Sequence, residues 1–208
     1  KWKSKKKRVH KHVGMSKKVI VGIAGKLASG KGTVTKYIVE NYAADKTRSS
    51  DPLRAVLDIF DVPQSRENLD ALSTFVRSTY GEDTIARAVA RVLRESHAQV
   101  AMFDGMRRLV DVETIRSFEH SLFIYVHADQ KLRYERCKQR NENVGDDVMS
   151  FEEFAEKDDD EPQQQIEALR EYADVVIDNN GDLDGLMKQI HEQIDTVINN
   201  FSLSTSSD

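Results

Sequence analysis

The chain has 208 residues, of which 39% are hydrophobic and 32% charged, a composition typical of a soluble globular domain with its own core. No stretch approaches the roughly 18 to 20 consecutive apolar residues of a transmembrane helix, so the composition argues against an integral membrane protein. The formal net charge of −4 is unevenly spread, because residues 1–18 hold nine lysines and arginines and no acidic residue, while the remainder is acidic.

These features predict a compartment and restrict the partners. A single cysteine, Cys137, cannot form an internal disulfide, and the six histidines lack the spacing of zinc ligands, so the reducing cytoplasm is expected. An acidic body is a poor general binder of nucleic acid, which requires a basic face. We expect nucleic acid as a partner only through the basic tail. Residues 1–17 are predicted to be a disordered extension without a catalytic part.

The first predicted elements are a strand and a helix. Lys18–Ala24 is rich in Val and Ile and too short for a helix, which predicts a buried strand that ends at Gly25. Thr33–Asn41 then shows the apolar spacing of an amphipathic helix. A strand followed closely by a helix is the opening of an α/β domain.

Helices alone are predicted for the next segment. Pro52 lies where the first turn of a helix is expected, and that helix reaches about Phe60. Gly81 separates two further helices, one passing through Phe75–Val76 and one after the glycine. The second has an apolar face made of Ile85, Val89, Val92 and Leu93.

The alternation of strand and helix resumes from Gln99. Strands are predicted over Gln99–Phe103 and Ser121–Val126, with a helix around residues 112–118 between them and a charged helix, Asp129–Arg140, after them. Strands separated by helices require crossover connections, which give a mainly parallel sheet with helices on both faces.

The last third of the chain repeats this pattern. Ser150 followed by Glu153 is a capping-box pattern that opens a short helix, and Ala173–Ile177 is interpreted as a fifth strand. A final helix is predicted from about Leu183. Its inward face consists of Leu186, Met187, Ile190, Ile194, Val197, Ile198 and Phe201.

One segment carries a specific chemical signal. Gly25-Lys26-Leu27-Ala28-Ser29-Gly30-Lys31-Gly32-Thr33 has the spacing G-x-x-x-x-G-K directly after a strand and before a helix. Glycines let backbone N–H groups surround phosphate oxygens, the helix adds the positive end of its dipole, and Lys31 supplies a mobile cation. The pattern predicts a phosphate-binding loop. The predicted ATP contacts within it are Gly25, Lys26, Ala28, Ser29, Gly30, Lys31, Gly32 and Thr33.

The same loop departs from the usual pattern at the metal position. Gly32 stands where a Ser or Thr usually binds Mg²⁺, and Thr33 is displaced by one residue. We expect Mg²⁺ bound with ATP to be held mainly by phosphates and water, with Asp104 in its outer shell and Thr33 as a second candidate. Asp104 ends the predicted strand Gln99–Phe103. The alternative is that Asp104 only begins a turn with Gly105 and has no role toward the metal.

Three segments resemble motifs of adenylate kinase and its relatives: the loop ending in GKGT, Ser50–Val56 (SDPLRAV) and Asp104–Arg107 (DGMR). The segment 173–181 (ADVVIDNNG) is similar to the terminal strand and loop of dephospho-CoA kinase and of an uncharacterised archaeal group of nucleotide-kinase-like proteins. The resemblance to that group extends from about Lys18 to Ile190. It implies a three-layer P-loop α/β fold with a mainly parallel five-stranded sheet, one domain over residues 18–201 and a frayed tail over 202–208.

The resemblance also implies residues that bind the acceptor, in helices between about residues 50 and 98. Arg54 matches an arginine that holds the acceptor phosphate in adenylate kinase, and Asp51 would shape that end of the pocket. Arg107 matches the arginine after the Asp-Gly pair, an acceptor-phosphate contact and part of the catalytic cage, although the usual proline is missing here. Arg77 is a further candidate.

A mobile lid over about residues 129–161 is implied as well. Arg136 and Arg140 match two arginines that clamp the transferring phosphoryl group, and their i, i+4 spacing puts both on one helix face, with Arg133 adjacent. A solvated cationic face is the alternative, more so for Arg133. The segment lacks the inserted domain and the cysteines of other lids, and its acidic run, residues 158–161, is expected to be a solvated loop. Relatives in the archaeal group place an arginine in that run.

Together these features predict ATP-dependent phosphoryl transfer to a small nucleotide-like acceptor, with a nucleoside monophosphate favoured. Asn180 falls in a segment that resembles the donor-adenine loop of such kinases and is the remaining predicted ATP contact. The expected partners are ATP with Mg²⁺ and a small phosphorylated molecule, and the protein is expected to be a monomer or a homodimer. Two alternatives stay open: dephospho-CoA as acceptor, and a nucleotide-binding or nucleotide-hydrolysing switch. A switch would not need the predicted arginines Arg54, Arg107, Arg136 and Arg140.

Overall fold

The computed structural model describes residues 18–140 and 149–203 of the chain. Its strands are β1 (Val19–Ala24), β2 (Asp45–Arg48), β3 (Val100–Asp104), β4 (Ser121–His127) and β5 (Val175–Asp178). Its helices in the first half are α1 (Lys31–Tyr42), α2 (Ser50–Ile59), α3 (Arg66–Tyr80), α4 (Thr84–Glu95) and α5 (Leu109–Arg116). Those in the second half are α6 (Gln130–Arg140), α7 (Phe151–Asp158), α8 (Glu161–Ala168), the short η1 (Leu169–Tyr172), and the consecutive α9 (Leu183–Gln189), η2 (Ile190–Asp195) and α10 (Thr196–Leu203).

The five strands form one sheet in the order β2-β3-β1-β4-β5, and every neighbouring pair is parallel. β1 lies at the centre, where Ile20 pairs with Ala101 of β3 on one side and with Ser121 of β4 on the other. All six residues of β1 are buried, as expected for a central strand covered on both faces. The carboxyl ends of all five strands therefore meet at one edge of the sheet.

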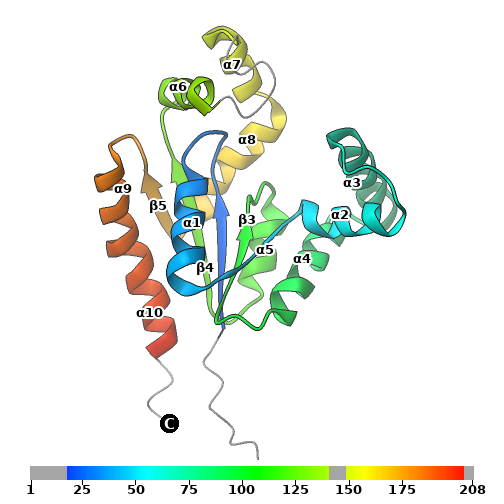
Figure 1. Cartoon of the computed structure of the whole chain (residues 1–208), viewed down its shortest axis with the longest axis horizontal. Coiled ribbons are helices and arrows are strands. Elements are labelled where there is room, and N and C mark those ends of the chain that lie inside the picture. Colours follow the sequence, from blue (N-terminus) through cyan, green and yellow to red (C-terminus); the bar gives the residue numbers. More distant parts are fainter. Residues whose placement is uncertain (1–17, 141–148, 204–208) are drawn as a thin grey trace, which may run out of the picture.

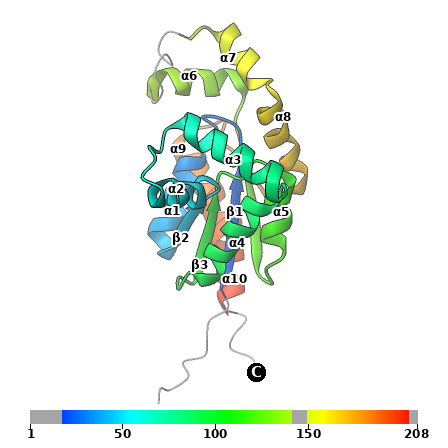
Figure 2. The ribbon, with the colours of Figure 1, turned by 90° about the vertical axis from the view of Figure 1, so that its right-hand side faces the viewer.

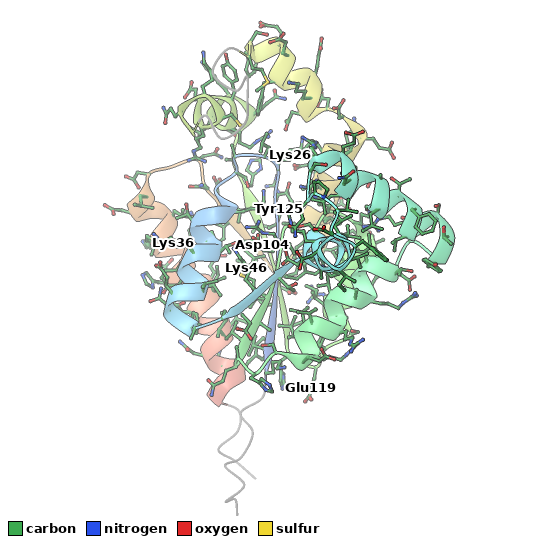
Figure 3. All side chains as sticks on the ribbon, turned by 45° about the vertical axis from the view of Figure 1, so that its right-hand side comes forward. Lys26, Lys36, Lys46, Asp104, Glu119 and Tyr125 are labelled. Atoms are coloured by element: carbon green, nitrogen blue, oxygen red, sulfur yellow. The ribbon has the colours of Figure 1, made fainter. Side chains whose placement is uncertain are left out.

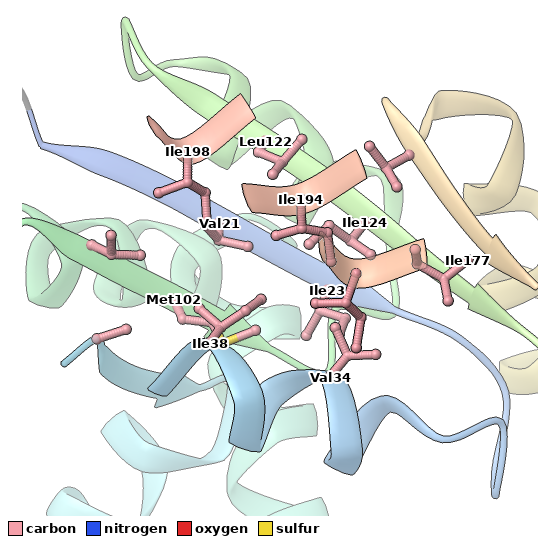
Figure 4. Packing of buried hydrophobic residues seen from close by; sticks show 14 of the residues in the cluster. Val21, Ile23, Val34, Ile38, Met102, Leu122, Ile124, Ile177, Ile194 and Ile198 are labelled. Carbon is pink, nitrogen blue, oxygen red and sulfur yellow. The ribbon is translucent and has the colours of Figure 1, made fainter. Parts of the chain in front are cut away.

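One face of the sheet packs against α1 and the C-terminal run of α9, η2 and α10 (Figures 1 and 4). Figure 4 shows Val34 and Ile38 of α1 and Ile194 and Ile198 of the C-terminal run directed at the apolar side chains of the strands. The inward face predicted for the last helix is confirmed, because Leu186, Ile190, Ile194 and Ile198 are buried and Met187, Val197 and Phe201 pack against the same core.

The opposite face of the sheet is covered by α4, α5 and the segment α8–η1. Its core contains Phe103, Phe123 and Tyr125 from the strands, packed with side chains from those three elements. The two cores on the two faces make the three-layer architecture that the sequence predicts. The whole assembly is held by apolar burial on both sides of the sheet, which is the dominant stabilising contribution in such folds.

Two groups of helices project from the carboxyl edge of the sheet (Figures 1 and 2). α6 and α7 lie above this edge, and the α2–α3 pair projects to one side. α3 has no buried residue, so it belongs to the periphery of the molecule. Within the described residues, no helix is long and apolar enough to cross a membrane.

The structure confirms the predicted fold class and four of the strands and corrects two details. The predictions place no strand before Gln99 other than β1, yet β2 occupies the sheet edge. Its sequence, DKTR, has only Thr47 buried, so it lacks the apolar pattern that identifies a strand. The helices α8 and η1 were also not predicted. The end of α10 at Leu203 includes two residues of the expected tail, and residues 204–208 lie outside the described part.

Candidate functional site

The predicted phosphate loop connects β1 to α1 at the carboxyl edge of the sheet (Figure 1). Gly25 and Gly30 have φ angles of 148° and 102°, which side chains rarely allow. A Cβ on Gly25 would lie 2.3 Å from the carbonyl oxygen of Val126, and a Cβ on Gly30 would lie 2.0 Å from Nδ2 of Asn179. The two motif glycines are therefore required by backbone conformation and by close neighbours.

The loop presents the groups that a phosphate needs. Lys31 is the first residue of α1, and its Nζ donates to the carbonyl oxygens of Gly25 and Lys26, so the ammonium lies against the loop backbone. Gly30 gives α1 no side-chain cap, which leaves the helix N-terminus to interact with an anion. The Ser29 side chain is buried, and its hydroxyl has no hydrogen-bond partner among the described residues. An uncapped helix end, a lysine and an unpaired hydroxyl all fit a bound polyphosphate.

The loop after β5 touches the phosphate loop through a residue that the sequence analysis missed. Asn179 is 6% exposed, and its Nδ2 donates to the carbonyl oxygen of Ser29 at 2.8 Å. Its own carbonyl oxygen accepts from Nη2 of Arg136 on α6 at 3.0 Å. The predicted Asn180 is exposed, and its Oδ1 accepts from the backbone N–H of Asp129. Two predicted residues, Arg136 and Asn180, are thus brought to the same end of the phosphate loop.

Asp104 lies at the end of β3 beside cations from β2. Its Oδ2 accepts from Nε of Arg48 at 3.3 Å and lies 3.8 Å from Nζ of Lys46, and Figure 3 shows Lys46 and Asp104 next to each other. The threonine that reaches Asp104 is Thr35, whose hydroxyl donates to Oδ1 at 3.4 Å, and not the predicted Thr33. The edge strand β2 therefore contributes two cations that the sequence analysis did not assign.

This arrangement suits Mg²⁺ that arrives with a nucleotide. Within the described residues, no group of three or more His, Cys, Asp or Glu side chains has the geometry of a metal site. Asp104 ends β3, the neighbour of β1, and its carboxylate can act on a hydrated ion whose other ligands are phosphate oxygens and water. A Cβ on Gly32 would have no atom within 4 Å, so the space where a Ser or Thr hydroxyl usually stands is open.

Arginines from two elements surround the loop after β3. Arg107 is exposed, and its guanidinium makes no hydrogen bond or ion pair with a described residue. Nη1 of Arg108 lies 2.9 Å from Oε2 of Glu82, and Nη1 of the mostly buried Arg77 lies 3.8 Å from the same oxygen. The pKa of Arg77 is lowered by burial and by the charge of Arg108. Arg77, Arg107 and Arg108 thus have two carboxylates beside them, Glu82 and Asp111, which leaves a net positive charge in this group.

A buried carboxylate fixes this loop. Oδ2 of Asp111 accepts from the backbone N–H groups of Arg107 at 2.9 Å and Arg108 at 3.1 Å. Burial raises the pKa of Asp111 despite these two hydrogen bonds. The N–H groups of Gly105 and Met106 both donate to the carbonyl oxygen of Ile23, so the loop is also attached to the strand that leads into the phosphate loop.

The predicted residues of α2 lie apart from this arginine group. Nη1 of Arg54 donates to Oε1 of Gln64 at 3.1 Å, and no contact joins Arg54 to Arg77 or Arg107 among the described residues. Oδ2 of Asp51 accepts from the backbone N–H of Arg48 at 2.7 Å, so Asp51 orders the turn between β2 and α2. Arg54 remains a predicted acceptor contact on a separate helix.

The lid segment differs from expectation at two residues. Arg133, for which a solvated face is the alternative, is 3% exposed, and Asp158, expected in a solvated loop, is 4% exposed and ends α7. They form a bidentate ion pair with each other, and Asp158 also accepts from Nζ of Lys26 of the phosphate loop at 3.2 Å. The side chain of Arg140 and residues 141–148 lie outside the described part.

A polar cavity of about 250 Å³ opens between these elements. Its walls come from the phosphate loop, the end of β4, the start of α6, the end of α7 and the end of α8. The side chains that line it include Lys26, Ser29, Tyr125, Gln130, Arg133, Asp158 and Glu167. The hydroxyl of Tyr125 donates to Oε2 of Glu167 at 2.7 Å, and burial together with this carboxylate raises the pKa of the tyrosine.

Comparison with known proteins agrees with this architecture. Residues 22–155 match the family model described as an AAA domain. A UPF0200 protein of Staphylothermus marinus is 30% identical over 165 residues, which cover 79% of this chain and 85% of that protein.

Two solved structures share the fold at low identity. A gluconokinase from Sinorhizobium meliloti gives a TM-score of 0.56 at 14% identity and covers 91% of this chain and 98% of its own. A shikimate kinase from Bacteroides thetaiotaomicron gives a TM-score of 0.52 at 10% identity, and the match covers 86% of this chain and 98% of that protein. At these identities the likeness shows the fold. The family match and the UPF0200 relative show that the chain belongs to the UPF0200 proteins and contains an AAA domain, and its fold is that of the kinase-like P-loop proteins.

Proposed function

We propose that this protein transfers the γ-phosphoryl group of ATP to a small anionic acceptor, with a nucleoside monophosphate favoured. The observation that carries the proposal is the exposed Arg107, whose guanidinium has no partner among the described residues, next to the paired Arg77 and Arg108. This group lies on a loop bonded to β1, which leads directly into the phosphate loop. Two anion-binding regions at one sheet edge are what a donor and a charged acceptor require.

The chemistry of such a transfer asks the protein to align two anions and to neutralise charge. Lys31 and the N-terminus of α1 would hold the donor phosphates, and Arg136, bonded to the carbonyl of Asn179, would act near them from α6. Arg107 would hold the acceptor against the repulsion between the two phosphates. Mg²⁺ bound with ATP would neutralise phosphate charge, with Asp104 oriented toward its hydration shell.

The alternatives make different demands on the site. Dephospho-CoA needs room for a long pantetheine arm, and the sequence offers no apolar stretch assigned to it. A nucleotide switch needs the phosphate loop but has no use for a second cationic region. The gluconokinase and the shikimate kinase of similar fold are both named as kinases of small molecules, which supports a small acceptor. Because ATP is the proposed phosphoryl donor and a single cysteine cannot form an internal disulfide, we propose that the reaction takes place in the cytoplasm.

Initial-rate kinetics of two variants test the second region. Arg107→Ala and Arg54→Ala should each raise the KM of the acceptor by roughly 10-fold or more, because a hydrogen-bonded charge pair contributes about 1.5–3 kcal/mol. The KM of ATP should change by less than about 2-fold. Arg66→Ala, which removes an exposed arginine of α3 paired with Asp70, is the matched control and should behave as wild type. Equal damage to ATP and acceptor would remove the arginine concerned from the acceptor site, and no effect from either variant would reject the acceptor region.

A further inference from the structure

Three consecutive residues of the phosphate loop are held by the segment that carries α6 and α7. Lys26 is bound by Asp158 at the end of α7. The carbonyl oxygen of Leu27 accepts from Nη1 of Arg133 on α6 at 3.4 Å. Ala28, whose φ is +59°, is buried in a small apolar cluster with Cys137, Met149 and Phe154. Lys26, Leu27 and Ala28 are therefore each attached to the segment that carries α6 and α7.

Asp158 is the centre of this attachment. Its side chain is 3% exposed, and its two oxygens accept from both terminal nitrogens of Arg133, from Nζ of Lys26 at 3.2 Å and from Nε2 of Gln130 at 3.2 Å. Burial acts to raise the pKa of Asp158, but hydrogen bonds and charge from Arg133, together with Lys26, hold the pKa below its ordinary value of 3.8. The carboxylate is therefore charged and fully bonded.

The attachment reaches the lysine of the phosphate loop through the backbone. The Lys26 side chain is anchored on Asp158, while its carbonyl oxygen accepts from Nζ of Lys31 at 2.8 Å. The position of the Lys26 backbone thus sets where the Lys31 ammonium rests. The neighbouring acids Asp159 and Asp160 are exposed and make no such contact with the loop.

We propose that Asp158 is a positioning residue that holds the phosphate loop and Lys31 in the geometry for nucleotide binding and transfer, acting through Lys26 and Arg133. The transfer part of this proposal rests on the proposed kinase function, whereas the binding part does not. It also assigns Lys26 a role different from the one expected. Lys26 anchors the loop to α7 and is not a direct phosphate ligand.

The test uses the full chain and a fluorescent ADP analogue, whose affinity is measured by titration, alongside kcat where an acceptor gives turnover. Asp158→Asn should weaken binding of the analogue by about 10-fold or more and lower kcat by at least as much, because Lys26 and Arg133 lose their counter-charge. Asp160→Asn removes an exposed acid two residues away and should leave both quantities unchanged. Asp158→Glu, which keeps the charge, should restore much of the affinity.

A double-mutant cycle with Lys26→Met shows whether Asp158 acts through Lys26. Lys26→Met should weaken nucleotide binding, and the double variant should be no weaker than Asp158→Asn alone. Tighter binding by Asp158→Asn would mean that the released Lys26 binds phosphate directly, and it would overturn the proposal. Strictly additive effects or unchanged binding would overturn it as well.

If Asp158→Asn does not fold, Lys26→Met decides, because this variant leaves the Arg133–Asp158 pair intact. Wild-type nucleotide affinity of Lys26→Met would then reject the role of Lys26 as an anchor. A wild-type protein that binds nucleotide but transfers no phosphate would refute the kinase function and leave the binding result standing.

Discussion

Gly30 and Gly32 stand two residues apart in the phosphate loop, yet the structure constrains only the first. Gly30 has a φ of 102° and has the amide of Asn179 where a Cβ would be, whereas the Cβ position of Gly32 is open. The motif identifies both glycines from local sequence. The role of Asn179 depends on a contact across 150 residues, and that of Asp158 on one across 132 residues, which no local pattern encodes. In the sequence, the loop after β5 is indicated as part of the site only because the segment around Asn179 resembles the donor-adenine loop of nucleotide kinases.

This contrast predicts opposite outcomes for two alanine variants. Gly30→Ala should lose nucleotide binding and destabilise the protein, since the added Cβ meets Asn179 and the left-handed backbone is strained. Gly32→Ala should keep the fold and raise the free energy of unfolding by up to about 0.5–1 kcal/mol, because alanine favours the helix that begins there. Thermal melts and nucleotide titrations of the pair check this. Similar behaviour of both variants would be incompatible with the described loop geometry.

Lys31→Ala should reduce phosphoryl transfer by about 10²–10³-fold, the cost typical of removing one charge-stabilising group from a transfer site. The fold should persist, because the Lys31 side chain belongs to neither of the two cores on the faces of the sheet, and its ammonium donates to the loop carbonyls of Gly25 and Lys26. Rate measurements combined with far-UV circular dichroism separate the two effects. Near-normal turnover in a folded variant would show that the loop is not the donor site.

At the scale of elements, apolar patterning predicts the strands that carry apolar runs and misses the strand that carries none. The strands β1, β3, β4 and β5 contain runs of apolar residues, and helices cover both faces of the sheet. β2 and β5 both lie at edges of the sheet, but β2 has only Thr47 buried, and its charged residues supply Lys46 and Arg48 to Asp104. The polarity that hides this strand from sequence analysis is the polarity that the site uses.

The helices α6 and α7, which lie above the carboxyl edge of the sheet, are expected to become more protected when both substrates bind. Exclusion of water from the transfer site requires closure of the surrounding segments. Peptides from α6 and α7 should therefore become more protected from hydrogen exchange when a bisubstrate analogue joining donor and acceptor binds. Peptides from α10, on the far side of the sheet, serve as the reference and should not change. If α6 and α7 exchanged at the same rate with and without the analogue, they would not form a lid.

At the scale of the whole molecule, carboxylates that join elements far apart in the sequence make stability depend on pH. Asp195 accepts hydrogen bonds from Tyr37 and Tyr42 of α1 and contacts His191, so it ties the C-terminal helical run to the helix after the phosphate loop. Burial acts to raise its pKa, but these bonds hold the pKa below 3.8, as Arg133 does for Asp158. Groups with a lowered pKa stabilise the fold above about pH 4 and lose that contribution as pH falls further.

The unfolding temperature should accordingly drop between pH 5 and pH 3. Asp195→Asn should lower it at pH 5 and flatten its dependence on pH, since that variant has no carboxylate to protonate there. Calorimetry of both proteins at four or five pH values measures the effect. An identical acid dependence in wild type and variant would show that the charge of Asp195 does not stabilise the contact between α1 and the C-terminal helical run.

If the phosphate loop and the cationic loop after β3 serve one transfer reaction, the wild-type protein should move the γ-phosphate of ATP to an acceptor. The direct measurement incubates the protein with ATP labelled at the γ-phosphate and, separately, with each nucleoside monophosphate and with dephospho-CoA, and then identifies the labelled products. We expect label on a nucleoside monophosphate, ADP in equal amount, and a yield of labelled product from Lys31→Ala that is lower by about 10²–10³-fold. Label on dephospho-CoA alone would replace the favoured acceptor. Release of inorganic phosphate at a rate independent of every acceptor would contradict the claim and identify the protein as a nucleotide hydrolase.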